Sequence, residues 1–216
     1  MKASGKVSIA LPTGVLMPGA LRLLAKAGLA RLSADQVGRQ LLVDRPQVRV
    51  ILVRPADVPA YVDHGAADLG IVGKDILWET PGAHYELADL RFGECRLVLA
   101  VPVASGLNGP ETWPPQMRVA TKYPRTAAEW FEARGQSVEV VRLHGSVELA
   151  PQVGLVDGIV DLTASGRTLK ENQLRITATL GVSTARLIAN QASLKTRTDA
   201  VQAVVGRLRE AASACQ

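Results

Sequence analysis

Short runs of β-branched and aliphatic residues recur along this sequence. Segments with the pattern of helices separate the first three of these runs. Val7–Leu11, Val48–Val53 and Ala67–Val72 have the length and composition of buried strands. Gly19–Ala27 and Asp57–His64 have apolar residues at helical spacing. Aromatic residues make up only 4% of the chain, so the core must consist mainly of aliphatic side chains. The alternation of strands and helices predicts a parallel α/β sheet.

The second half of the chain continues this pattern after a break near residues 90–96. Further strands are expected at Arg96–Val103, Arg118–Ala120, Ser137–Arg142, Gly158–Leu162, Leu174–Thr179 and Thr184–Ala189. Further helices are expected at Lys74–Trp78, Thr126–Arg134, Glu148–Gly154 and Thr198–Ala212. Because these strands are too many for one simple sheet, we expect two α/β lobes with a cleft between them. The apolar stripe of the last helix is expected either to pack on its own lobe or to contact another subunit.

Charge and composition narrow the classes of function. The 216 residues have a formal net charge of +5, but Lys and Arg are scattered and do not alternate with aromatic residues, so we expect no nucleic-acid binding. Cys95 and Cys215 lie far apart and the three His lack ligand spacing, so no metal site made of side chains is expected. The sequence shows no signal peptide and no apolar segment of membrane length, so we expect a cytoplasmic protein without membrane contact.

The segment Val156–Leu169, VDGIVDLTASGRTL, has the pattern of a phosphate-binding turn. A β-branched strand runs to Asp161, and small residues then lead into a helix, so that consecutive backbone N–H groups can approach a phosphate. An acidic residue just before such a turn suits a sugar phosphate, because carboxylates accept hydrogen bonds from ribose hydroxyls. The candidate binding residues are Asp157, Asp161, Thr163, Ala164, Ser165, Gly166, Arg167 and Thr168.

The same segment has a second interpretation. Ser165 or Thr168 would simply cap the helix, and the two aspartates would be solvated. The residues by themselves do not decide between a phosphate-binding turn and a capped helix entry.

Two further segments place charged residues near expected strand ends. Arg54 follows the buried strand Val48–Val53, where ligand groups collect in open α/β sheets, although an isolated Arg is more often part of a surface ion pair. Glu148 lies just after the turn Gly145–Ser146. His144 precedes this turn, but nothing nearby completes a Ser or Cys nucleophile system, so hydrolase chemistry is not expected.

Six segments together resemble the ATP phosphoribosyltransferase family, and they follow the family's order across nearly the whole chain. They are IALPTG at 9–14, VRPADVPAYVDHGAADLGIVGKD at 53–75, YELADLRFGECRLVLAVP at 85–102, VATKYP at 119–124, GSVELAPQVGLVDGIVDLTASGRTL at 145–169 and ARLIANQASLKT at 185–196.

This resemblance implies a two-lobed fold similar to type II periplasmic binding proteins. Residues 1–92 and 180–216 would form the first lobe, and residues 93–179 the second lobe with the phosphoribosyl pyrophosphate loop. The length of the chain matches the short form of the family, which acts with a regulatory subunit related to histidyl-tRNA synthetase, as homodimers within a hetero-oligomer. The implied location is the cytoplasm.

The implied reaction is attack of N1 of ATP on C1 of phosphoribosyl pyrophosphate, the first step of histidine biosynthesis. Thr163–Thr168 would hold the 5-phosphate, and Asp161 with Asp157 the ribose hydroxyls. Arg54 and Arg39 would bind the leaving pyrophosphate, with Mg²⁺ held mainly through the substrate phosphates. Glu148 is expected to face the sugar or the nucleotide.

The sequence departs from the family pattern at two places. Thr13 and Val15 stand where the family usually has Lys and Arg in a pattern like KGRL, and His144 stands where Asn is common. The loss of two charges leaves ATP contacts undefined. It also leaves an alternative function possible: the chain would be an inactive member of the family or a small-ligand binding module on the same fold.

Overall fold

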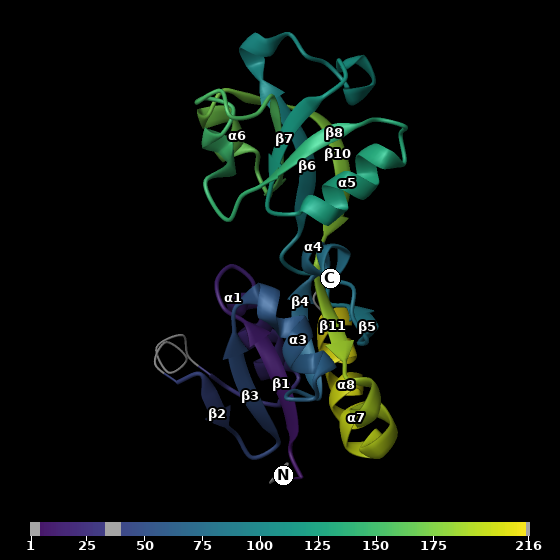
Figure 1. The fold of residues 1–216 in the computed structure, drawn as a ribbon. Coiled ribbons are helices and arrows are strands. Elements are labelled where there is room, and N and C mark those ends of the chain that lie inside the picture. The colour runs from purple at the N-terminus through teal and green to yellow at the C-terminus, as the bar shows by residue number, and fades with distance from the viewer. Residues whose placement is uncertain (1–4, 33–39, 215–216) are drawn as a thin grey trace. The chain divides into compact units, whose positions relative to one another are not determined.

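The computed structural model describes residues 5–32 and 40–214 (Figure 1). The strands are β1 (Val7–Pro12), β2 (Leu42–Asp44), β3 (Val48–Val53), β4 (Leu69–Gly73), β5 (Tyr85–Asp89), β6 (Cys95–Pro102), β7 (Met117–Thr121), β8 (Val138–Arg142), β9 (Gly158–Thr163), β10 (Leu174–Ser183) and β11 (Ala185–Ala189). The α-helices are α1 (Met17–Lys26), α3 (Val58–Asp63), α4 (Lys74–Glu79), α5 (Pro124–Glu132), α6 (Arg167–Glu171), α7 (Gln191–Thr196) and α8 (Thr198–Ser213). The 3-10 helices among these residues are η1 (Pro55–Asp57), η2 (Val103–Ser105), η3 (Pro110–Thr112) and η4 (Val147–Leu149).

The contacts divide the chain into two units. Unit 1 is Met1–Gly93 with Thr184–Gln216, and unit 2 is Glu94–Ser183. The boundary expected between residues 179 and 180 falls inside β10, which belongs as a whole to unit 2. The chain leaves and re-enters each unit at neighbouring points. The amide of Ala185 donates to the carbonyl of Phe92 in unit 1 (2.9 Å), and Cys95 pairs with Ser183 in unit 2.

The sheet of unit 1 has the strand order β2-β3-β1-β4-β11-β5. β1 is parallel to β3 and β4, whereas β11 is antiparallel to both β4 and β5. The purely parallel sheet that the alternation predicted is therefore a mixed one. β11 follows unit 2 in the sequence and yet lies between two strands that precede it (Figure 1), so the C-terminal segment completes this sheet.

The helix α8 packs on its own unit. Its stripe of Val201, Val204, Val205, Leu208 and Ala211 is buried in the same core cluster as α1 and β1. A fully buried Val or Leu stabilises a fold by about 1.5–3 kcal/mol relative to its exposed state. Of the two fates expected for this stripe, packing on its own lobe is the one observed.

A buried polar network joins three distant segments of unit 1. Asp68 is fully buried, and its Oδ2 accepts hydrogen bonds from the amide and the hydroxyl of Ser8 (both 2.8 Å) and from Arg197 (2.7 Å). Its Oδ1 accepts from the hydroxyl of Ser193 (2.7 Å). Arg197 also donates to the carbonyl oxygens of Gly5 and Lys6. The network fixes α7 and the start of α8 against β1.

The sheet of unit 2 has the strand order β10-β6-β9-β7-β8. β7 is parallel to β8 and β9, and β6 is antiparallel to β9 and β10. The carboxyl ends of the three parallel strands therefore lie together at one end of the sheet, which we call its carboxyl edge. The connections that leave this edge are Lys122–Tyr123, Leu143–Ser146 and Ala164–Gly166.

Four elements among the described residues differ from the sequence-based expectations. The edge strands β2 and β5 and the short helix α7 were not predicted. The helix expected at Glu148–Gly154 is wrong, because only the 3-10 helix η4 forms there, followed by turns. Pro151 explains this, since it has no amide hydrogen and its ring clashes with the carbonyl four residues earlier in an α-helix. No helix among the described residues is long and apolar enough to cross a membrane.

Candidate functional site

A turn of three residues joins β9 to α6 at the carboxyl edge of the unit 2 sheet. The hydroxyl of Thr163, the last residue of β9, accepts a hydrogen bond from the amide of Gly166 (2.8 Å) and closes the turn. Gly166 has a φ of +75°, in the left-handed region that glycine enters without steric cost. Leu169 is 3% exposed and anchors α6 in the unit 2 core. The strand end and this anchor hold the turn in a defined shape.

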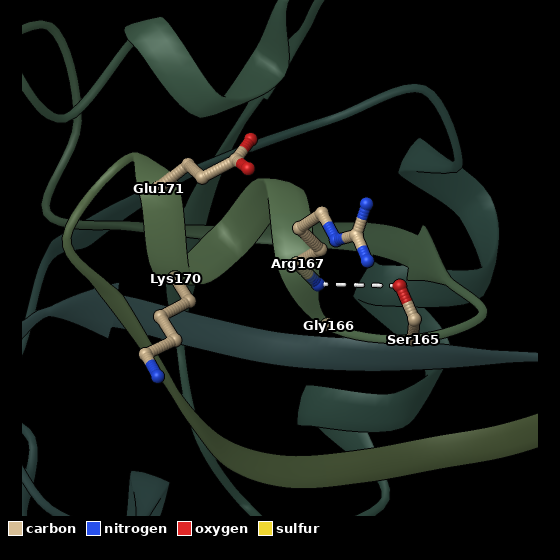
Figure 2. Close-up of a pocket in the computed structure, with 5 residues that line it drawn as sticks. All are labelled: Ser165, Gly166, Arg167, Lys170 and Glu171. Carbon is tan, nitrogen blue, oxygen red and sulfur yellow. Dashed lines mark hydrogen bonds between the residues drawn. The ribbon is translucent and has the colours of Figure 1, made fainter.

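The turn lines a hollow of about 590 Å³. Figure 2 shows the lining residues, with the amide of Arg167 donating to the hydroxyl of Ser165 at 3.4 Å; they are Ser165, Gly166, Arg167, Lys170 and Glu171. Ala164, Ser165, Arg167 and Thr168 are exposed. The first amides of α6 have no acceptor within the helix, as at any helix start. An open turn with an Arg and a Lys beside it suits an anionic group.

Asp161 lies on β9, two residues before the strand ends, and is only 6% exposed. Burial raises the pKa of its carboxyl above the ordinary value, and the carboxylate of Glu148 acts in the same direction. Lys122 and a hydrogen bond with the backbone of Leu162 oppose this effect and lower the pKa. Asp161 is therefore a buried acid whose charge depends on its neighbours.

The alternative interpretation of this segment, a simply capped helix entry, agrees with the hydrogen bond from the amide of Arg167 to the hydroxyl of Ser165 but not with two other features. The N-cap of α6 is Gly166, which makes no side-chain cap hydrogen bond. Asp161 is buried rather than solvated. The turn thus keeps the features that the phosphate-binding interpretation requires.

The structure brings Glu148 to Asp161 but leaves Asp157 apart. Glu148 lies in η4, which packs against β9. Asp157 precedes the first residue of β9, so the whole strand separates it from the turn. Its Oδ2 accepts a hydrogen bond from the amide of Arg118 (2.8 Å) at the start of β7. Asp157 therefore joins β9 to β7 at the amino ends of these parallel strands, away from the turn.

The remaining candidates belong to unit 1. Arg54 is exposed directly after β3, at the edge where the parallel strands β1, β3 and β4 end. Thr13 and Val15 follow β1 at the same edge, and Val15 is 94% exposed. Arg39 lies outside the described residues.

Lys122 is a charged neighbour of the candidate site that sequence reasoning missed. It stands in VATKYP, directly after β7, and its effect on Asp161 comes from the parallel pairing of β7 with β9. The VATKYP segment gave the only available signal, since the two residues are 39 positions apart in the sequence and no local spacing connects them.

Comparison with known proteins gives two close likenesses. An ATP phosphoribosyltransferase of Caldanaerobacter subterraneus is 46% identical over 206 residues, which cover 94% of this chain and 96% of the relative. In a solved ATP phosphoribosyl transferase (HisG:HisZ) complex from Thermotoga maritima, one chain superposes with a TM-score of 0.81 at 34% identity and covers 96% of this chain and 98% of that one.

A more distant likeness concerns the fold. A periplasmic sulfonate-binding protein of Methylobacillus flagellatus superposes with a TM-score of 0.66 at 17% identity, covering 95% of this chain and 67% of that one. The expected type II periplasmic-binding-protein-like fold is thereby confirmed.

A sequence model described as ATP phosphoribosyltransferase matches residues 54–210 of this chain. Together with the identity and coverage of the Caldanaerobacter subterraneus relative, this match shows that the chain belongs to the ATP phosphoribosyltransferase family.

Proposed function

We propose that this chain transfers the phosphoribosyl group of phosphoribosyl pyrophosphate to N1 of ATP, giving phosphoribosyl-ATP and pyrophosphate. Family membership supports the reaction, and the turn after β9 supports the place where the sugar phosphate binds. The observation with the most weight is the buried acid Asp161 beside a glycine turn at the edge of the sheet.

The turn binds the 5-phosphate in this proposal. The backbone amides of Ala164, Ser165 and Thr168 and the hydroxyls of Ser165 and Thr168 supply donors, and Arg167 supplies a fixed positive charge. Thr163 also shapes the turn, because its hydroxyl accepts from the amide of Gly166, and its own O–H can donate to the phosphate.

Asp161 and Glu148 accept hydrogen bonds from the ribose hydroxyls. We leave Asp157 out of the binding site, because it is hydrogen-bonded to Arg118 at the other edge of the sheet. The transfer builds positive charge on the sugar ring, which a nearby carboxylate stabilises. No covalent nucleophile takes part.

Arg54 and Arg39 are proposed to bind the leaving pyrophosphate. Arg54 is exposed at the carboxyl edge of the unit 1 sheet, where ligands collect in α/β folds. Guanidinium groups match phosphate oxygens in geometry and remain charged at all working pH values.

Mg²⁺ fits this site as an ion that arrives with the substrate. Among the described residues no three His, Cys, Asp or Glu side chains form a metal-binding group. Mg²⁺ is commonly held through substrate phosphates and water with few protein ligands, and when bound in this way it would offset charge on the pyrophosphate. The protein's own task is to position the two substrates.

A regulatory subunit is the proposed partner. The Thermotoga maritima relative was solved as a HisG:HisZ complex, and the likeness to its structure covers 96% of this chain. We propose the same kind of assembly here, with homodimers of this chain inside a hetero-oligomer, in the cytoplasm.

Pyrophosphate release tests the proposed function directly. Purified protein with ATP, phosphoribosyl pyrophosphate and Mg²⁺ should release pyrophosphate, and mass spectrometry should find phosphoribosyl-ATP. The assay is run with and without the regulatory subunit. Binding of both substrates without product under either condition would favour the inactive or binding-only alternative.

Replacing Gly166 by Ala should raise the KM for phosphoribosyl pyrophosphate about tenfold. A left-handed backbone costs an L-residue about 1–2 kcal/mol, and the added methyl group lies in the turn that binds the phosphate. Gly135→Ala is the matched control. Gly135 has a φ of +67° after α5, and a Cβ at either glycine meets no atom within 4 Å. Both variants should lose similar thermal stability, but only Gly166→Ala should change KM. Equal KM values for the two variants would contradict the assignment of the turn.

A further inference from the structure

Lys122 directly follows β7, and Asp161 lies on the neighbouring strand β9 next to the last paired residues of the two strands. In the parallel pairing of β7 with β9, Ala120 lies opposite Ile159 and Thr121 opposite Val160. Ala120 and Ile159 belong to one core cluster and therefore point to one face. Asp161, two positions beyond Ile159 on β9, returns to that face, and Lys122 directly follows Thr121, whose register partner Val160 directly precedes Asp161.

The surroundings of Asp161 differ on its several sides. On β6 its register partner is Val98, an apolar residue. From η4, which covers this face, the carboxylate of Glu148 repels its charge. From the end of β7, the ammonium of Lys122 attracts it, and on its own strand the backbone of Leu162 donates a hydrogen bond. Lys122 is exposed, whereas Asp161 is 6% exposed.

We propose that Lys122 is a positioning residue for the transfer reaction: from the end of the strand next to Asp161, its ammonium attracts the buried carboxylate and holds it as an acceptor for the ribose hydroxyls. This inference rests on the proposed function of the site. A buried carboxylate beside a second carboxylate favours its protonated form, and a protonated acid loses part of its accepting capacity. An adjacent cation shifts the balance toward the ionised form.

The expected result concerns the pH profile. Without Lys122, burial and Glu148 act unopposed by the ammonium, and the pKa of Asp161 rises further. Lys122→Gln should therefore move the acid limb of kcat/KM for phosphoribosyl pyrophosphate to higher pH. On the acid limb of the profile the variant should lose roughly tenfold in kcat/KM, and above that limb it should recover most of this loss.

Two variants and a charge-matched control separate this role from others. Lys122→Arg keeps the positive charge and should restore the wild-type profile. Glu148→Gln in the Lys122→Gln background removes the repelling carboxylate, so it should bring the acid limb back toward lower pH. Lys195→Gln, on the exposed face of α7 in unit 1, makes the same change in net charge and should leave the profile unchanged.

The outcomes are distinct. An inactive wild-type protein would overturn the proposed function itself. An active wild-type protein with superimposable profiles for Lys122→Gln and the Lys195→Gln control would overturn only the role of Lys122. A loss in Lys122→Gln that is equal at every pH would also overturn it, since that result indicates a direct substrate contact.

Discussion

Asp161→Asn should lower kcat/KM for phosphoribosyl pyrophosphate by at least about a hundredfold and at the same time raise the melting temperature near neutral pH. The first effect follows from the loss of the carboxylate that accepts the ribose hydroxyls and stabilises the charge on the sugar ring. The second follows from burial, because the neutral amide avoids the penalty that raises the pKa of Asp161. Steady-state kinetics and thermal melting check the two effects separately.

The stability effect has a defined sign with pH. Since the pKa of Asp161 is raised in the folded protein, its contribution to stability is complete below the unfolded pKa and is lost as pH rises through the folded pKa. The melting temperature of Asp161→Asn should therefore exceed that of the wild type at neutral pH and approach it in acid. Asp157→Asn, at the other end of the same strand, is the matched control and should keep its activity. Near-normal turnover of Asp161→Asn would contradict the site.

Asp68→Ala should lower the free energy of unfolding of unit 1 by about 3–5 kcal/mol, the cost of leaving a buried charge without its partner. Asp68 is fully buried and receives hydrogen bonds from Ser8, Ser193 and Arg197. The substitution leaves the guanidinium of Arg197 and the buried amide of Ser8 without this acceptor. Urea unfolding followed by circular dichroism measures the loss.

Asp44→Ala is the control for this prediction. Asp44 forms an ion pair with Arg49 at 2.9 Å on the exposed edge of the same sheet, and exposed ion pairs contribute little to stability. Its unfolding curve should stay close to that of the wild type. Similar curves for Asp68→Ala and Asp44→Ala would show that the buried network does not stabilise unit 1.

The sequence predicted the central strands well and the edges poorly. The runs that became β1, β3 and β4 are rich in buried aliphatic residues, and burial on both faces produces such continuous runs. β2 has only three residues, and in β5 no residue is buried. Short, exposed strands form because a neighbour offers free backbone groups, and local sequence does not contain that information.

The site was predicted only where local chemistry defines it. The small residues after Asp161 indicated the turn, since a glycine and short side chains are what a close phosphate needs. Asp157 looked equivalent to Asp161 in the sequence, but the length of the intervening strand puts it at the other edge of the sheet. Lys122 was missed because strand pairing, rather than sequence spacing, brings it to Asp161.

The hydrogen bond between Ala185 and Phe92 has a consequence for how this protein can be rebuilt. The two cut points of unit 1 are adjacent, and β6 begins beside the residue where β10 ends. Unit 2 is therefore a continuous segment inserted at one position of unit 1, between Gly93 and Thr184. If a short turn replaces Glu94–Ser183, unit 1 should still fold. Exchanging unit 2 between relatives should carry the turn after β9 into another protein without changes to the core of unit 1.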